Sequence, residues 1–209
     1  MGTLSDLQTR IATDLTRSDL TSQIASAVGD AIAHYARERF WFNTSRNLGF
    51  GTVPGQIAYG VNDASVIPNL VRIDALFVPQ AQSVLPLDRY EAPDFEMLNN
   101  GATGGGIPNS FTYVDQTIRL WPTPNSVFAL ILHGHYKLPA LVNGTDSNAW
   151  TNDAEELIRS HAKLLLYTDV LEDPDGAQRM SAKIPALLDA LRAESSARAA
   201  SGIIQGTDF

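Results

Sequence analysis

The spacing of apolar residues changes twice along this chain, and that change limits the folds open to it. Before residue 47 and after residue 150, apolar residues recur every three or four positions, as in amphipathic helices. Between 47 and 146 this period is absent, and Gly, Pro, Asn, Val and aromatic residues are common, which is typical of strands and turns. We therefore expect an α+β fold in which N- and C-terminal helices form a helical bundle and the middle forms a β-rich, antiparallel meander insertion.

The same pattern sets the expected domain limits. Residues 1–46 and 147–200 should together form the helical bundle domain, because neither end can bury its apolar stripe alone. Residues 47–146 should form the β-rich insertion on that helical base. Residues 201–209, which read SGIIQGTDF, have no apolar period and are expected to be a flexible C-terminal tail.

Capping patterns indicate where the N-terminal helices begin. Ser5-Asp6-Leu7-Gln8 is a capping-box pattern, which predicts a helix at about 5–16. Thr21 can cap a second helix, and its apolar spacing continues to about Phe42.

The C-terminal helices are expected in two segments. A capping-box pattern from Asn152 to Glu155 begins the first, which should end near Asp173. The second is expected at about 175–200. Pro185 lies inside it and should kink or split it, because proline removes one helical hydrogen bond.

Strands are expected in the middle of the chain. Leu70–Val78 is an apolar, β-branched run, and Ala92–Leu98 is expected to be a short helix with Pro93 in its first turn. The strands of the meander are expected at 110–114, 117–121 and 127–137. The turns between them are Asp115-Gln116 and the proline-rich segment Pro122–Asn125.

The composition excludes several classes of function. With 15 Lys and Arg against 23 Asp and Glu, the net charge is −8, which argues against binding to nucleic-acid phosphates. The chain has no cysteine, so disulfides, thiolate nucleophiles and zinc–thiolate sites are excluded. No apolar run approaches the roughly 20 residues that a membrane span requires, and the N-terminus lacks a signal-peptide pattern.

Two histidines are the best candidates for a metal site. His133 and His135 are separated by one residue, so on a strand both side chains would face the same side. Asp115 is the best candidate for a third ligand, but ordinary polar strand positions are the better interpretation.

Gly104–Gly106 lack the Lys-Ser or Lys-Thr of a phosphate loop. The remaining histidines, on predicted helices, are interpreted as packing or interface residues: His34 and His161.

Paired carboxylates are the other candidates for chemistry. Glu155 with Glu156, and Asp173 with Asp175, lie at a predicted helix start and at a turn between helices. Capping and the helix dipole explain acidic residues at such places, whereas acid–base catalysis needs carboxylates whose pKa values are pushed apart in a cleft. No serine lies in a nucleophile-elbow pattern either, so the sequence shows no clear catalytic group.

A small basic group precedes the β-rich region. Arg37, Arg39 and Arg46 flank the aromatic run Phe40–Phe42, and such a combination can stack single-stranded bases. The better interpretation is that the arginines form the solvated edge of a helix. The aromatic run would then fill the junction with the β-rich part.

Several segments resemble the head-to-tail adaptor, or connector, proteins of short-tailed bacteriophages. The central one is a strand at Ile118–Trp121, followed by Pro122-Thr123-Pro124 and by a strand that leads into Tyr136–Leu141. The other segments that carry the resemblance are Leu4–Ile11, Ala27–Tyr35, Glu38–Phe42 and the acidic helix start after Asn152. Together they span nearly the whole chain.

The resemblance implies a structural protein of the virion that is made in the host cytoplasm, and it implies no enzyme and no catalytic residues. Such adaptors form a homo-oligomeric ring, here expected to have twelve subunits, that docks beneath the portal protein at the head–tail junction. The ring extends the DNA channel and offers a platform for the downstream tail or nozzle protein. DNA should pass through without sequence-specific binding, and no cofactor, metal or membrane is implied.

The expected contact residues are those that would meet the portal or a neighbouring subunit. They are Arg37, Arg39, Trp41, Trp121, Ile203, Ile204 and Phe209. The last three are unusual in a tail that stays in water, and burial on a neighbour would offset the entropy lost when the tail becomes ordered.

Two alternatives from other classes stay open. A β-rich module that binds glycans would use these aromatic residues as a stacking platform: Trp121, Trp150, Tyr113 and Tyr136. A metal-dependent hydrolase would be built on His133 and His135. Bound glycan or bound metal would favour one of these, whereas association with a portal would favour the adaptor.

Overall fold

The computed structural model describes residues 2–60, 63, 69–98 and 104–199. It contains helices and mainly antiparallel sheets, which confirms the mixed α+β class. The chain divides into two compact units: residues 1–42 with 138–209, and residues 43–137. We call the first the helical unit and the second the β unit.

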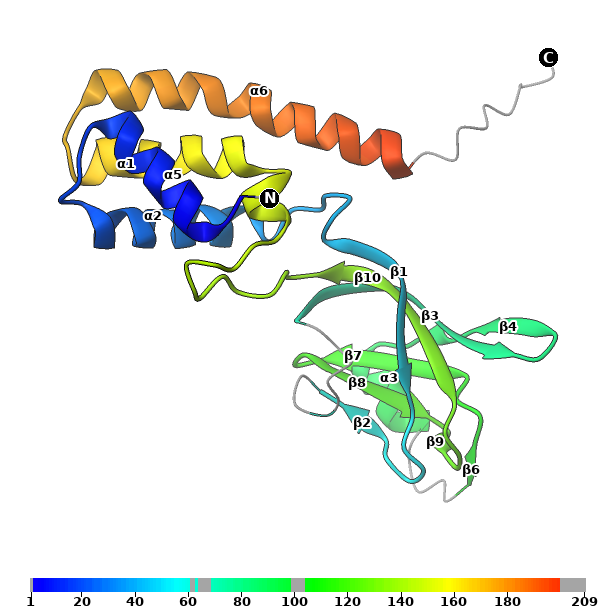
Figure 1. Ribbon diagram of the computed structural model, residues 1–209. Helices are drawn as coiled ribbons and strands as arrows, with labels where there is room; N and C mark the ends of the chain where they lie inside the picture. Colours follow the sequence, from blue (N-terminus) through cyan, green and yellow to red (C-terminus); the bar gives the residue numbers. More distant parts are fainter. Residues whose placement is uncertain (1, 61–62, 64–68, 99–103, 200–209) are drawn as a thin grey trace, which may run out of the picture. The chain divides into compact units, whose positions relative to one another are not determined.

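Five helices make up the described part of the helical unit (Figure 1). They are α1 (Leu4–Leu15), α2 (Thr21–Tyr35), α4 (Ala149–Asn152), α5 (Glu155–Asp169) and α6 (Pro174–Ala199). α5 contacts each of the other four helices. Ile11, Ala31 and Ile158, from three different helices, are almost completely buried in one core. The N- and C-terminal segments of the chain therefore bury their apolar stripes against each other.

The helix caps differ from those expected. The capping box of α1 lies two residues earlier: the Thr3 hydroxyl accepts a bond from the Asp6 N–H at 3.1 Å, and the Asp6 carboxylate accepts one from the Thr3 N–H at 2.9 Å. The box expected at Asn152 is absent, because Asn148 caps the short α4 and α5 begins without a side-chain cap. Polar residues therefore cap the starts of α1 and α4, whereas α5 follows α4 without a cap of its own.

Two helices end or continue differently from the prediction. α2 stops at Tyr35 rather than near Phe42, because the chain leaves the helix and stacks Phe40 on Phe42 inside the core. α6 runs through Pro185 without a break. Pro185 is exposed, so water can bond the carbonyl that the proline leaves without a helical donor. Within the described residues, no helix is long and apolar enough to cross a membrane.

The β unit contains two four-stranded sheets (Figure 1). Its elements are β1 (Thr44–Gly51), β2 (Ala58–Tyr59), β3 (Leu70–Gln80), β4 (Ser83–Pro86), β5 (Asp88–Arg89), α3 (Ala92–Leu98), β6 (Gly105–Gly106), β7 (Ser110–Val114), β8 (Thr117–Trp121), β9 (Thr123–Pro124) and β10 (Ala129–Tyr136). One sheet has the order β1-β10-β3-β4, the other has β2-β8-β7-β5, and β6 pairs with β9. Leu76 and Leu130 from the first sheet and Phe111 and Leu120 from the second form one core.

The expected three-strand meander is wrong. β7 and β8 pair antiparallel, but β10 pairs with β1 and β3 in the other sheet. The connection from β8 contains Pro122 and Pro124, which cannot take the positive φ angles of a tight hairpin turn and lack an amide hydrogen. The chain therefore passes through β9 and crosses to the other sheet.

Candidate functional site

The expected contact residues lie in different parts of the chain. Arg37 and Arg39 are exposed in the segment that follows α2, and Trp121 is half-buried at the end of β8. Three of the expected residues lie outside the part of the chain that the structure describes: Ile203, Ile204 and Phe209. Among the contact residues that the structure describes, Arg37, Arg39 and Trp41 share one segment.

Trp41 joins the segment after α2 to the end of α6 inside the helical unit. Its backbone N–H donates to the Ser195 hydroxyl at 3.2 Å, and the guanidinium carbon of Arg198 lies 3.7 Å from its ring centroid. The Glu38 carboxylate accepts bonds from Arg192 at 2.8 and 3.1 Å. A cation over an aromatic face is stabilising, so these contacts hold the last turns of α6 against the segment after α2.

The aromatic residues of the glycan alternative are used for packing. The side chain of Trp150 is only 2% exposed, and its ring meets those of Phe40 and Phe42 edge-on, with centroids 5.9 and 4.9 Å away. The Tyr113 hydroxyl donates to the Leu70 carbonyl at 3.1 Å, and its ring packs on the core of the β unit. Trp150 therefore offers no exposed face on which a sugar could stack, and Tyr113 is half-buried.

The two candidate metal ligands on β10, His133 and His135, lie among other side chains of the β unit. The ring of His133 packs on that of Phe77, with centroids 4.8 Å apart, and His135 is buried. The pairing of β10 with β3 shifts between His133 and Gly134, which disturbs the alternation that would place both imidazoles on one side. Among the described residues, no group of three His, Asp or Glu side chains could hold a metal ion.

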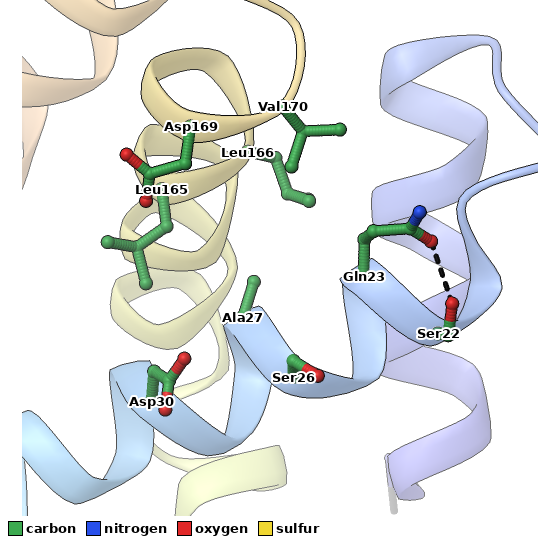
Figure 2. Close-up of a pocket in the computed structure, with 9 residues that line it drawn as sticks. All are labelled: Ser22, Gln23, Ser26, Ala27, Asp30, Leu165, Leu166, Asp169 and Val170. Atoms are coloured by element: carbon green, nitrogen blue, oxygen red, sulfur yellow. Dashed lines mark hydrogen bonds between the residues drawn. The ribbon is translucent and has the colours of Figure 1, made fainter.

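A groove of about 590 Å³ lies between α2 and α5 (Figure 2). Its apolar lining includes Ala27, Leu165 and Leu166. The polar lining comes from Ser22, Gln23, Ser26, Asp30 and Asp169. The Ser22 hydroxyl donates to the side-chain amide oxygen of Gln23 at 2.8 Å. The apolar part of the lining is suited to binding an apolar group.

The charges at the groove indicate what such a group would carry. Asp30 and Asp169 are exposed, and neither forms an ion pair with another described residue. Asp169 is in the last turn of α5, where the negative end of the helix dipole disfavours a carboxylate. A cation beside this rim would be stabilised by both carboxylates and by the dipole.

A polar cluster joins α2 to α5 deeper in the helical unit. The Tyr35 hydroxyl lies 2.8 Å from Nδ1 of His161, and the ring centroids of His34 and His161 are 4.8 Å apart. Burial lowers the pKa of the His161 imidazole, and the neighbouring His34 lowers it further. Burial also raises the pKa of the Tyr35 hydroxyl. In the sequence, Tyr35 and His161 recur at the apolar spacing of their helices, and this is the signal that predicted a packing role for them.

Comparison with known proteins relates the whole chain to a family. A family model described as SU10 adaptor protein matches residues 2–205. No protein with a curated description matches the chain.

Proposed function

Because the chain belongs to the SU10 adaptor protein family, a family of structural bacteriophage adaptors, we propose that it forms the head–tail adaptor ring of a short-tailed phage. In this proposal twelve copies dock beneath the portal protein and extend the DNA channel. The free side of the ring serves as the platform for the next tail or nozzle protein.

The observation that carries this proposal is the extent of the family match. Residues 2–205 include every described helix of the helical unit and every described strand of the β unit. The match therefore concerns the two-unit chain and not a single common motif.

The charge of the chain supports the passage of DNA through such a ring. With a net charge of −8, the subunit repels phosphates, and twelve copies multiply that repulsion. A basic lining would hold DNA through released counterions and slow its movement. An acidic lining leaves the DNA free to slide, without sequence-specific contacts.

The helical unit is the proposed site of portal contact. Its groove between α2 and α5 combines an apolar lining with the unpaired carboxylates of Asp30 and Asp169. A portal segment with an apolar side chain next to Lys or Arg would match both features. The exposed Arg37 and Arg39, together with residues 201–209, are the further proposed contacts, and the β unit is proposed to meet neighbouring subunits or the tail.

Light scattering on the purified protein, alone and mixed with the portal of the same phage, tests the proposal. We expect a shift on mixing that corresponds to the portal plus a ring of subunits. A monomer alone is compatible with assembly on the portal only. The absence of association at every salt concentration would refute the adaptor function.

The groove has its own test in the same assay. Replacing both Asp30 and Asp169 with Asn should weaken portal binding at least tenfold and reduce its dependence on salt. Asp153→Asn is the matched control, since this exposed carboxylate lies outside the groove. Equal affinities of the double variant and the control would remove the groove from the portal contact.

A further inference from the structure

Among the described residues, the strand order β1-β10-β3-β4 places β1 and β4 at the two edges of this sheet. Strand edges carry unpaired N–H and C=O groups that can pair with another chain. Soluble proteins usually guard such edges with charged side chains, proline, bulges or very short strands. The presence or absence of these protective features on β1 and β4 therefore indicates whether either edge could pair with another chain.

The edge at β4 belongs to a hairpin that projects from the β unit (Figure 1). All four residues of β4 are exposed, and Val84 and Leu85 are 58% and 43% exposed. From 75 to 87 the chain has no charged residue. Pro86 guards only the last position of the strand. The rest of this edge, Ser83 to Leu85, is uncharged and exposed.

The opposite edge has the same character over half its length. Arg46 and an irregular pairing with β10 guard the beginning of β1. From 47 to 60 the chain has no charged residue. Gly49 and Gly51 are exposed there, and they leave the backbone without side chains that would hinder an approaching strand.

We propose that β4 of one copy pairs with the β1 edge of the next copy, so that subunits join through opposite edges of the same sheet. The inference rests on the proposed ring, because it supplies the contact between neighbouring subunits. Opposite edges make a heterologous contact, which a rotation closes into a ring. Two copies of charge −8 repel each other, and these edges are surfaces where they can meet without opposing charged side chains.

Engineered disulfides test the contact directly, because the chain has no cysteine of its own. Val84→Cys or Leu85→Cys is combined with Gly49→Cys or Gly51→Cys, which covers the possible registers. A Cβ at Gly49 meets only the Leu130 carbonyl oxygen, at 3.8 Å, so cysteine fits there. Opposing residues on paired strands have Cα atoms about 4.5–5.5 Å apart, within the range that a disulfide bridges.

The expected result is a ladder of covalent oligomers that ends at the ring copy number and collapses on reduction. At least one double variant should give it under conditions where rings form. Each single variant should give no species beyond a dimer. Val84→Cys with Val114→Cys is the control pair, because Val114 is 40% exposed but lies on the other sheet.

A charge variant tests the same edge without cross-linking. Val84→Lys should raise the concentration needed for ring formation at least tenfold, alone or on the portal, because the lysine would be placed in an uncharged edge. Met97→Lys is the matched control, since Met97 is 75% exposed on α3 and gains the same charge. Both residues are exposed, so both variants should keep the circular dichroism spectrum of the unmodified protein.

The outcomes separate this inference from the proposed function. Rings that form normally with Val84→Lys, or that give no ladder with any double variant, would overturn the edge contact and leave the ring intact. A strong dimer from Val84→Cys alone would show a symmetric contact between two β4 strands and would also overturn it. If the unmodified protein forms no ring, alone or with the portal, the proposed function fails and this inference fails with it.

Discussion

Replacing Trp150 with alanine is the sharpest test of how the helical unit is held together. Trp150 is 2% exposed and meets the rings of Phe40 and Phe42 edge-on. Truncating a buried tryptophan costs about 3–5 kcal/mol, of which two edge-on aromatic contacts account for about 1–3 kcal/mol. Since single domains are stable by about 5–15 kcal/mol, the variant should lose at least about a fifth of its free energy of unfolding.

Urea denaturation followed by far-ultraviolet circular dichroism measures this loss, because the helical unit gives most of the helical signal. Trp150→Phe is the graded variant and should cost less than half as much, since it keeps one ring against Phe42. Met97→Ala is the surface control and should change stability by less than about 0.5 kcal/mol. A loss below about 1.5 kcal/mol for Trp150→Ala would refute the core role and return Trp150 to the glycan-binding alternative.

Three further predictions concern single positions. Burial and the neighbouring His34 lower the pKa of His161 in the folded protein, so the unfolded chain takes up a proton more readily. The free energy of unfolding should therefore fall as pH drops below about 6.5. His161→Gln should flatten that decline, as measured by denaturation curves at several pH values. Gly134→Ala places a Cβ 2.6 Å from the Arg72 carbonyl oxygen and should destabilise the β unit by about 1–3 kcal/mol; unchanged hydrogen exchange in β10 would contradict this. Thr3→Ala removes the cap of α1 and should cost about 1 kcal/mol, measured by thermal denaturation against Thr13→Ala, whose hydroxyl bonds only within its own helix.

The elements that could be predicted from the sequence are those with a local cause. The capping pattern near the N-terminus placed the start of α1 within one residue, and Leu70–Val78 lies inside β3. Pro93 lies in the first turn of α3, where its missing N–H costs nothing. Each of these signals acts within one turn or one strand, so the sequence alone contains it.

The features that escaped prediction depend on contacts distant in the sequence. β10 pairs with β1 and β3, which begin more than 50 residues earlier, and no local pattern distinguishes these partners from β8. α2 ends at Tyr35 because Phe40 and Phe42 are buried against Trp150, far along the chain. The groove and the pairing of Tyr35 with His161 arise in the same way from the register of α2 on α5.

The first and last strands of the β unit, β1 and β10, pair with each other. Thr44 pairs with His135, and the Tyr136 N–H donates to the Asn43 carbonyl at 3.0 Å, so the chain enters and leaves the β unit at one point. Two helical segments whose ends are this close can be joined by a few residues, because the cost of closing so short a gap is small. Replacing or removing residues 43–137 should therefore leave the core of the helical unit intact.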